Sequence, residues 1–302
     1  MLTGPLLDSA LAADRALAPA CPDEAAWMRL WTAEDLGALT PEAMALRGGL
    51  QADRLPWCFI AGYQAAQRRI FPELPAGGWA AFAASEAADD AEDRPGAALH
   101  ETQGTLRLEG HKNWIAQSRH VAHLLVTLNG PDGRPGRTVL VSADAPGVSL
   151  NHRDSPSFLA GMSQGRARFE AVTVDPDHLF AAERARQFGR AEPRCVMLAC
   201  AAFLLGRIPG TDAPALREDL TALVLALSDL CLAEPPLPRL LAALDRALGR
   251  AADEFERQGL ADRVPHWTDD KPLIRLYSRR IQQRAVREDG RGADTDKTGE
   301  AR

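Results

Sequence analysis

The segment between residues 99 and 126 has the side chains best suited to chemistry, because a tryptophan, several histidines and several hydroxyl groups lie close together in it. Trp114 offers a large apolar surface for a planar aromatic ligand, although an indole is also an ordinary core residue of a β module. His120 and His123 are three residues apart, which in a strand places them on opposite faces, so we expect no metal site. Trp114 by itself therefore leaves both interpretations open, a contact for an aromatic ligand and a residue of the β core.

Bulk properties remove several function classes. The sequence contains no Gly-x-Gly-x-x-Gly, no P-loop and no Gly-x-Ser-x-Gly, which argues against the common nucleotide-binding folds and hydrolases. The net charge of −6 argues weakly against nucleic acid as a partner. Five cysteines without a Cys-x-x-Cys pair fit a reducing compartment, so we expect a cytoplasmic protein. No apolar run has membrane-spanning length.

The elements that must hold Trp114 follow from hydrophobic patterning. Residues 105–109 alternate as in a half-buried strand, Gly110 is expected to form a turn, and residues 121–128 read as a second strand. Short alternating segments separated by Gly, Pro and Asp continue to about residue 177, which predicts a small β-barrel or sandwich.

Helical periodicity lies on both sides of this β module. The expected N-terminal helices span 6–17, 22–30 and 57–71. Thr32 and Thr40 are expected to cap the starts of further helices. After residue 176 the helical pattern returns at 199–208, 215–232, 237–258 and 271–286. The apolar stripes of these later helices require mutual burial, which predicts a bundle.

The chain of 302 residues is longer than a typical single domain. We predict an α+β multidomain protein with an N-terminal helical domain, a middle antiparallel β-barrel or sandwich and a C-terminal helical bundle. The predicted boundaries are 1–78 for the first domain, 79–178 for the β domain, 179–287 for the bundle and 288–302 for a disordered tail.

Several landmarks in a fixed order resemble the acyl-CoA dehydrogenase family. The order strand, Gly-x-Lys-x-Trp-Ile, strand resembles the family's middle domain, with Trp114-Ile115-Ala116 at its Trp-Ile-Thr stretch. Upstream, Phe82-Ala-Ala-Ser85-Glu86 is similar to its aromatic residue, two small residues and Thr-Glu. Downstream, Thr138–Val148 is similar to the family's strand and Pro-Gly-Val turn. Gly161-Met162 is similar to the family's Gly-Met segment, and Arg168–Pro176 to the last strand of its middle domain.

The resemblance implies an FAD-dependent oxidoreductase acting on CH–CH groups. Its chemistry would be α-proton abstraction from an acyl thioester such as an acyl-CoA, with hydride transfer from the β carbon to FAD. The family binds FAD between the β module and the bundle, which implies cofactor contacts at Phe82, Ser85 and Trp114. Ala116 stands where the family has a hydroxyl at the flavin edge, and Ser118 could substitute for it.

The resemblance also implies a catalytic carboxylate. Many members carry it late in the bundle beside a Gly-Gly-x-Gly-Tyr stretch, which nothing between Pro235 and Arg302 matches. A minority carry it on the first bundle helix, where Glu192 is the best match. Glu192 would lie at a helix start with Pro193 at the first position, where a carboxylate also suits the helix dipole. The acidic stretch Ala88-Asp89-Asp90 replaces the family's Gly-Ser loop and could repel a pyrophosphate.

Family members usually pair through the bundle, which implies a homodimer or homotetramer, and an electron-transfer flavoprotein would be the electron acceptor. A basic stripe in the last helix is most simply a solvated face, although it could meet cofactor phosphates; it comprises Arg275, Arg279, Arg280, Arg284 and Arg287. Two alternatives stay open. The chain could be a non-catalytic relative that acts as a binding or partner subunit, or a flavin-dependent monooxygenase of the same fold.

Overall fold

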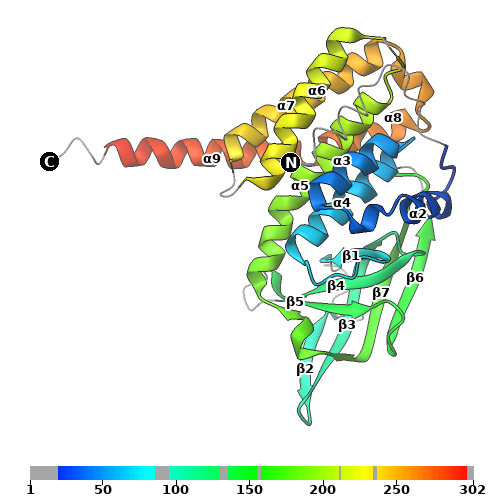
Figure 1. Cartoon of the computed structure of the whole chain (residues 1–302). Coiled ribbons are helices and arrows are strands. Elements are labelled where there is room, and N and C mark those ends of the chain that lie inside the picture. Colours follow the sequence, from blue (N-terminus) through cyan, green and yellow to red (C-terminus); the bar gives the residue numbers. More distant parts are fainter. Residues whose placement is uncertain are drawn as a thin grey trace. The chain divides into compact units, whose positions relative to one another are not determined.

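The computed structural model describes residues 20–85, 95–129, 135–154, 158–210, 212–233 and 237–297. The chain divides into two compact units that interleave along the sequence. One, here called the β unit, comprises Ala20–Met44 and Tyr63–Glu192; the other, the helical unit, comprises Met1–Pro19, Ala45–Gly62 and Pro193–Arg302. The predicted order of helices, sheets and helices is confirmed (Figure 1). The three domain boundaries remain a prediction, and the helix expected at 6–17 lies outside the described residues.

The β unit contains two four-stranded sheets. One has the order β1-β4-β5-β8, with bounds Trp79–Ala83, Val121–Asn129, Pro135–Ser142 and Leu179–Phe180. The other has the order β2-β3-β7-β6, with bounds Ala98–Thr102, Thr105–Ala116, Ser163–Val174 and Val148–Asp154. Strands β1 and β4 pair in parallel, and the other described pairs are antiparallel. Neither sheet closes on itself among the described strands, so of the two predicted forms the barrel is wrong.

Alternating side chains of both sheets form the core of the β unit. Leu108 and Ile115 of β3 are buried in one cluster with Val126 of β4, Val139 of β5 and Phe169 of β7. Burying such side chains stabilises a fold by about 1.5–3 kcal/mol each. The period of two is kept in β4, where Leu124, Val126 and Leu128 are all in the cluster.

The turn predicted at Gly110 is wrong, because β3 runs through it as one 12-residue strand. The pairing of β3 with β7 shifts between Leu108 and Gly110, which marks a bulge. Gly110 has a φ of 112°, and a Cβ there would lie 2.3 Å from the carbonyl oxygen of Gly96. The glycine thus allows a bulge and a close backbone approach without ending the strand. The chain reverses later, where the N–H of His120 donates to the carbonyl of Gln117.

Helices of the β unit begin with α2 (Glu24–Ala33), followed by the short η1 (Leu36–Ala38). Asp23 caps α2 by accepting a hydrogen bond from the N–H of Ala26. The prediction that Thr32 caps a helix start is wrong, because Thr32 lies in the last turn of α2 and its hydroxyl donates to the carbonyl of Met28. The expected helix at Thr40 is confirmed as α3 (Pro41–Gln51), with proline at its first position.

Helix α3 and two longer helices, α4 (Leu55–Ile70) and α5 (Ala182–Gly206), contribute residues to both units. Within the helical unit they pack closely at glycines. A Cβ on Gly49 of α3 would lie 2.2 Å from the carbonyl oxygen of Ala199, and one on Gly62 of α4 would lie 2.4 Å from Cα of Val196. A larger residue at either position would force the backbones apart.

The rest of the helical unit follows in chain order as α6 (Pro214–Leu232), α7 (Pro238–Arg257), η3 (Leu260–Arg263), α8 (Trp267–Asp270), η4 (Lys271–Arg275) and α9 (Ser278–Lys297). Helix α9 continues past residue 288, where we expected order to end, and residues 298–302 lie outside the described part. All five cysteines are free thiols and buried. No helix in the described ranges has the length and apolar character needed to cross a membrane.

Candidate functional site

The centre of the candidate site is Tyr63, on the part of α4 that belongs to the β unit. Its side chain is 1% exposed, and its hydroxyl both accepts from and donates to the main chain of Phe82 on β1. It accepts a hydrogen bond from the N–H of Phe82 at 2.7 Å and donates one to the carbonyl at 3.3 Å. A buried hydroxyl needs such partners, and here they also anchor α4 to β1.

Tyr63 lies at the junction of aromatic side chains from four elements. Its ring meets the indole of Trp114 on β3 edge-on, with ring centroids 6.3 Å apart, and the ring of Phe188 on α5 at 5.8 Å. Phe188 in turn stacks on Phe82 at 4.1 Å. We call Tyr63, Phe82, Trp114 and Phe188 the Tyr63 cluster. Edge-to-face and offset pairs are favoured because ring edges are positive and ring faces negative.

Trp114 is half-buried, so part of its indole remains accessible. The indole N–H donates to Oε1 of Gln164 on β7 at 2.9 Å, which satisfies its polar edge and leaves the apolar faces of the ring for packing. The two other residues expected near a flavin edge lie deeper. Ala116 is fully buried, and Ser118 is 2% exposed.

Ser118 faces β7 rather than the surface. A Cβ on Gly165 would lie 2.7 Å from Cβ of Ser118 and 2.9 Å from its hydroxyl oxygen. Within the described residues, that hydroxyl has no hydrogen-bond partner. Ser118 therefore sits in a tight contact between the turn after β3 and the start of β7.

Ser85, at the end of the segment after β1, is exposed. Its carbonyl accepts a hydrogen bond at 2.8 Å from the N–H of Asn113, the residue that directly precedes Trp114. The main chain of Ser85 is therefore bonded to the residue that precedes Trp114, and the roles assigned to both residues at a flavin stay predictions. The acidic stretch Ala88-Asp89-Asp90 lies outside the described residues.

Glu192 does not begin a helix, because α5 starts at Ala182 and continues through Pro193. Pro193 lacks the N–H that would bond the carbonyl of Gly189, but the buried apolar run that follows it sustains the helix. Glu192 is half-buried. It follows Phe188 by four residues, so both side chains share one face of α5. Burial and, second, the charge of Glu192 raise the pKa of Tyr63, which places this carboxylate near the cluster.

A buried polar network fixes α4 against β1 and the turn after β3. The amide of Gln64 donates to the carbonyl of Ala80 at 2.7 Å and to Oε1 of Gln117 at 2.8 Å. The guanidinium of Arg68 donates to Oε1 of Gln64 at 2.6 Å and to the carbonyl of Gly78 at 2.7 Å. Burial lowers the pKa of Arg68 to about 10. The amide nitrogen of Gln64 and the two terminal nitrogens of Arg68 all donate to neutral oxygens, and these bonds hold α4 one residue away from Tyr63.

Two groups of the β unit are of the kind that would contact the ring system of a flavin. The accessible indole of Trp114 is a wall for a planar aromatic, and the exposed Ser85 beside it can supply a hydroxyl or its peptide group. Sequence reasoning missed Tyr63 and Phe188. The signal for Phe188 was its four-residue spacing from Glu192, and the signal for Tyr63 was its place in an aromatic-rich helix.

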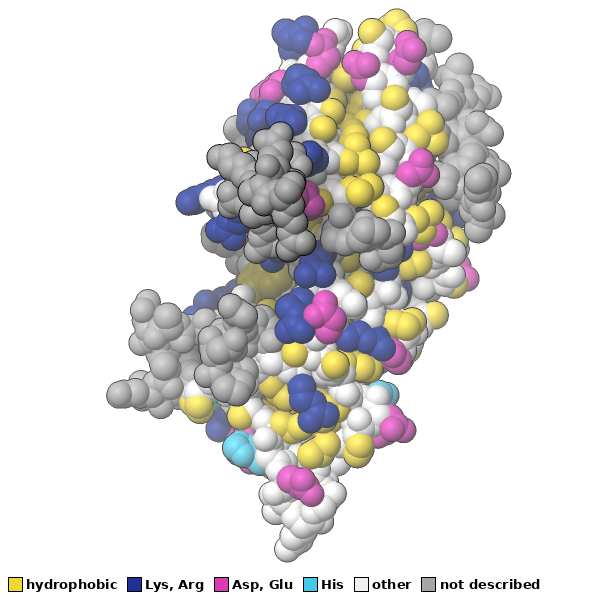
Figure 2. Space-filling view, turned by 90° about the vertical axis from the view of Figure 1, so that its left-hand side faces the viewer, with side chains coloured by type: hydrophobic (Ala, Val, Ile, Leu, Met, Phe, Trp, Pro, Cys, Tyr) yellow, Lys and Arg dark blue, Asp and Glu magenta, His cyan; other side chains and the backbone are white. Residues whose placement is uncertain are grey.

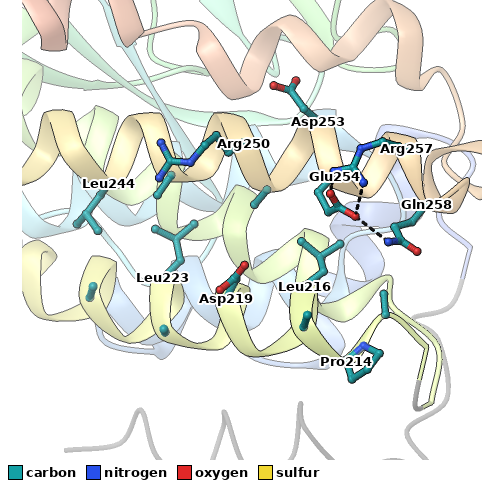
Figure 3. Close-up of a pocket in the computed structure, with 16 residues that line it drawn as sticks. Pro214, Leu216, Asp219, Leu223, Leu244, Arg250, Asp253, Glu254, Arg257 and Gln258 are labelled. Atoms are coloured by element: carbon teal, nitrogen blue, oxygen red, sulfur yellow. Dashed lines mark hydrogen bonds and ion pairs between the residues drawn. The ribbon is translucent and has the colours of Figure 1, made fainter.

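A groove of about 1120 Å³ lies in the helical unit between α6 and α7 (Figure 3). None of the predicted site residues is among the residues that line it. Leu216, Leu223 and Leu244 line it together with several alanines. Glu254, on its rim, accepts hydrogen bonds from Arg257 at 3.0 Å and from Gln258 at 2.7 Å. The carboxylate of Glu254 is therefore bonded to its neighbours along the chain rather than directed into the groove. No group of three or more His, Cys, Asp or Glu side chains in the described residues could hold a metal ion.

The surface turned to the viewer in Figure 2 has a band of hydrophobic side chains in its upper part, with charged side chains on both sides. Apolar residues exposed on the described helices of the helical unit include Leu225 and Leu232 of α6 and Leu240 of α7, at 44%, 52% and 44%. Single exposed leucines of this kind are common on protein surfaces and do not define a site.

No protein-family model matches the chain, and no curated protein matches it. Solved structures do. An FAD-dependent dehydrogenase is 16% identical with a TM-score of 0.66, covering 94% of this chain and 96% of that one. Butyryl-CoA dehydrogenase from Megasphaera elsdenii is 14% identical with a TM-score of 0.62 and the same coverage. The ChsE4-ChsE5 complex from Mycobacterium tuberculosis is 15% identical with a TM-score of 0.55, covering 97% and 95%. At such identities the similarity shows the fold.

Proposed function

We propose that this chain, which has the fold of the acyl-CoA dehydrogenases, is an FAD-dependent oxidoreductase that introduces a double bond next to the carbonyl of an acyl thioester. The observation that carries the proposal is the Tyr63 cluster. Trp114, the implied flavin wall, packs against Tyr63, and Glu192, the implied base, lies one helical turn after Phe188, which packs against the same tyrosine.

Each residue would have a separate task. Bound FAD would supply the hydride acceptor. Trp114 would hold the ring by apolar contact, and Ser85 would offer a polar contact at its edge. Glu192 would take the proton from the α carbon onto a carboxylate oxygen, and its partial burial would keep water from competing. The aromatic side chains around Tyr63 would keep these groups in place.

Flavin binding is tested first, by titrating FAD into the purified protein and recording the visible spectrum. We expect saturable binding with a perturbed flavin spectrum. Trp114→Ala should weaken binding by about tenfold because the stacking surface is lost, whereas Trp114→Phe, which keeps an aromatic face, should bind within about threefold of the unchanged protein. A protein that binds no FAD at saturating concentration would contradict the proposal.

The finer assignments belong to the same proposal. The first substrates to assay are acyl-CoA thioesters, with a dye and then an electron-transfer flavoprotein as acceptor. A homodimer or homotetramer and a cytoplasmic location are proposed on the resemblance and the cysteine content. Sedimentation of the purified protein tests the first of these.

A second candidate is a non-catalytic partner subunit of the same fold. The position of Ala116 and Ser118 favours it, because both are buried and neither offers the hydroxyl that the family uses at the flavin edge. One similar structure is a complex of two proteins, which gives this candidate a precedent. Absence of flavin absorbance after supplementation with FAD, together with capture of a second, flavin-bearing relative, would decide for it.

A further inference from the structure

We infer that Tyr63 is a positioning residue, which holds the indole of Trp114 and the helix face carrying Glu192 in one fixed arrangement. Its catalytic consequence rests on the proposed function. Its structural content does not, because the contacts that support it belong to the protein without any ligand.

The hydroxyl of Tyr63 provides the anchor. It bonds both the N–H and the carbonyl of Phe82, at 2.7 and 3.3 Å, so the side chain cannot slide along β1 without breaking a buried hydrogen bond. Only a neutral phenol can make both bonds, since a phenolate has no proton to donate. Burial, with a further contribution from Glu192, raises the pKa of Tyr63 and keeps the phenol neutral.

Because the hydroxyl fixes the ring of Tyr63, the ring in turn restrains the two aromatic side chains that it contacts, Trp114 and Phe188. Its contact with Trp114, at an interplanar angle of 72°, restricts the indole from one side, while Gln164 restrains the indole N–H from the other. Its contact with Phe188, at 76°, restricts α5 one helical turn before Glu192. Phe188 is also stacked on Phe82, the residue whose main chain holds the hydroxyl, so the contacts form a closed set.

The hydroxyl and the ring can be tested separately. Tyr63→Phe removes both hydrogen bonds and keeps the ring, and Tyr63→Leu also removes the edge contacts. Tyr277→Phe is the matched control, because Tyr277 is the other tyrosine of the chain and lies in the helical unit. Far-ultraviolet circular dichroism and melting curves identify any variant that does not fold, and Tyr63→Phe is the variant on which the outcome depends.

The first readout needs no flavin. Near-ultraviolet circular dichroism is recorded for each protein and for its Trp114→Phe counterpart, and the difference isolates the signal of Trp114. We expect Tyr63→Phe to reduce this difference signal by about half or more, since a freed indole averages over orientations, and Tyr277→Phe to leave it unchanged. An unchanged signal in folded Tyr63→Phe overturns the inference, whether or not the protein binds FAD.

The second readout is kinetic. With the holoenzyme, Tyr63→Phe should lower kcat about ten- to a hundredfold while KM stays within about twofold, because misplacing a base affects the reaction more than substrate binding. Equal kcat values for Tyr63→Phe and Tyr277→Phe would overturn the catalytic part. If the unchanged protein has no activity, the proposed function fails, and the circular dichroism result alone decides the inference.

Discussion

The Tyr63 cluster and the α6–α7 groove are opposite kinds of region. The groove has a volume of about 1120 Å³, yet its lining comes from two helices that are consecutive in the sequence. The acid Glu254 on its rim is bonded to Arg257 of its own helix and to Gln258, the residue after that helix. The cluster is largely filled by side chains, yet it joins residues from α4, β1, β3 and α5. Convergence of distant segments, rather than hollow space, therefore marks the candidate site.

The difference has a physical origin. Two neighbouring antiparallel helices with alanines between them leave a shallow groove as a matter of local packing. A closed set of aromatic contacts around a hydrogen-bonded tyrosine requires four elements to be placed together, which orders side chains at a cost in conformational entropy. A site needs side chains fixed in this way, because a catalytic base and a bound ring system must keep a constant position relative to each other.

The largest effect expected from this comparison is on catalysis at Glu192. Glu192→Gln removes the proton acceptor without changing the shape of the side chain, so kcat for an acyl thioester should fall by about 10²- to 10⁴-fold. Glu183→Gln is the control, because Glu183 lies on the same helix but pairs with Arg186 at the surface. Stopped-flow reduction of the bound flavin measures both. Equal rates for the two variants would remove Glu192 from the mechanism.

The second largest effect is expected on the free energy of unfolding, which should fall much more for a substitution in the Tyr63 cluster than for one on the exposed surface of α6. Phe82→Ala leaves a cavity against Phe188 and Phe71, and we expect it to lower the free energy of unfolding by about 3–5 kcal/mol. Leu225→Ala, at an exposed position of α6, should change it by less than about 0.5 kcal/mol. Urea unfolding of both variants gives the values, and a similar loss in each would mean that the cluster is not specially packed.

A pH effect is expected at Glu24, whose carboxylate accepts hydrogen bonds from the N–H and hydroxyl of Ser163. Burial raises its pKa from 4.5 to about 7, against smaller opposing effects of Ser163 and Arg119. Between these values the folded state binds the proton more tightly than the unfolded state does. The contribution of Glu24 to stability is therefore full below pH 4.5 and falls by about 3 kcal/mol as the pH rises to 7.

Glu24→Gln keeps an acceptor for Ser163 and removes the titration. The free energy of unfolding of the unchanged protein, minus that of the variant, should decline from pH 4.5 through 7 and become level at about pH 8. Because other titrating groups are common to both proteins, they cancel in this difference. A difference that rises with pH would show that the carboxylate is stabilised as an anion, contrary to this account.

The smallest effect concerns the tight contact beside the cluster. Gly165→Ala would place a Cβ 2.7 Å from Cβ of Ser118 and 2.9 Å from the carbonyl oxygen of Asn151, so we expect a loss of about 1–3 kcal/mol from overpacking. Gly77→Ala is the control, since a Cβ there meets no atom within 4 Å. Thermal melting compares them. Equal melting temperatures would indicate that β7 can move away from Ser118.

Much of the architecture could be predicted from local patterns. An apolar, β-branched run predicted β4 at residues 121–128, and a proline after Thr40 predicted the start of α3. Local reasoning failed where a residue has two compatible conformations. Gly110 can form a turn or a bulge, Thr32 can cap a helix or bond back within one, and Pro193 can begin a helix or be carried inside it. Tertiary burial decided each case.

The sequence by itself determined the order of helices, sheets and helices, because hydrophobic period and turn residues act over a few positions at a time. It also singled out Trp114, Ser85 and Glu192 as candidates through their order along the chain. Only the tertiary structure decided that Trp114 remains accessible while Ala116 and Ser118 are buried, and that Tyr63 joins the candidates. Contacts between residues more than fifty positions apart depend on how whole elements pack, which no local pattern encodes.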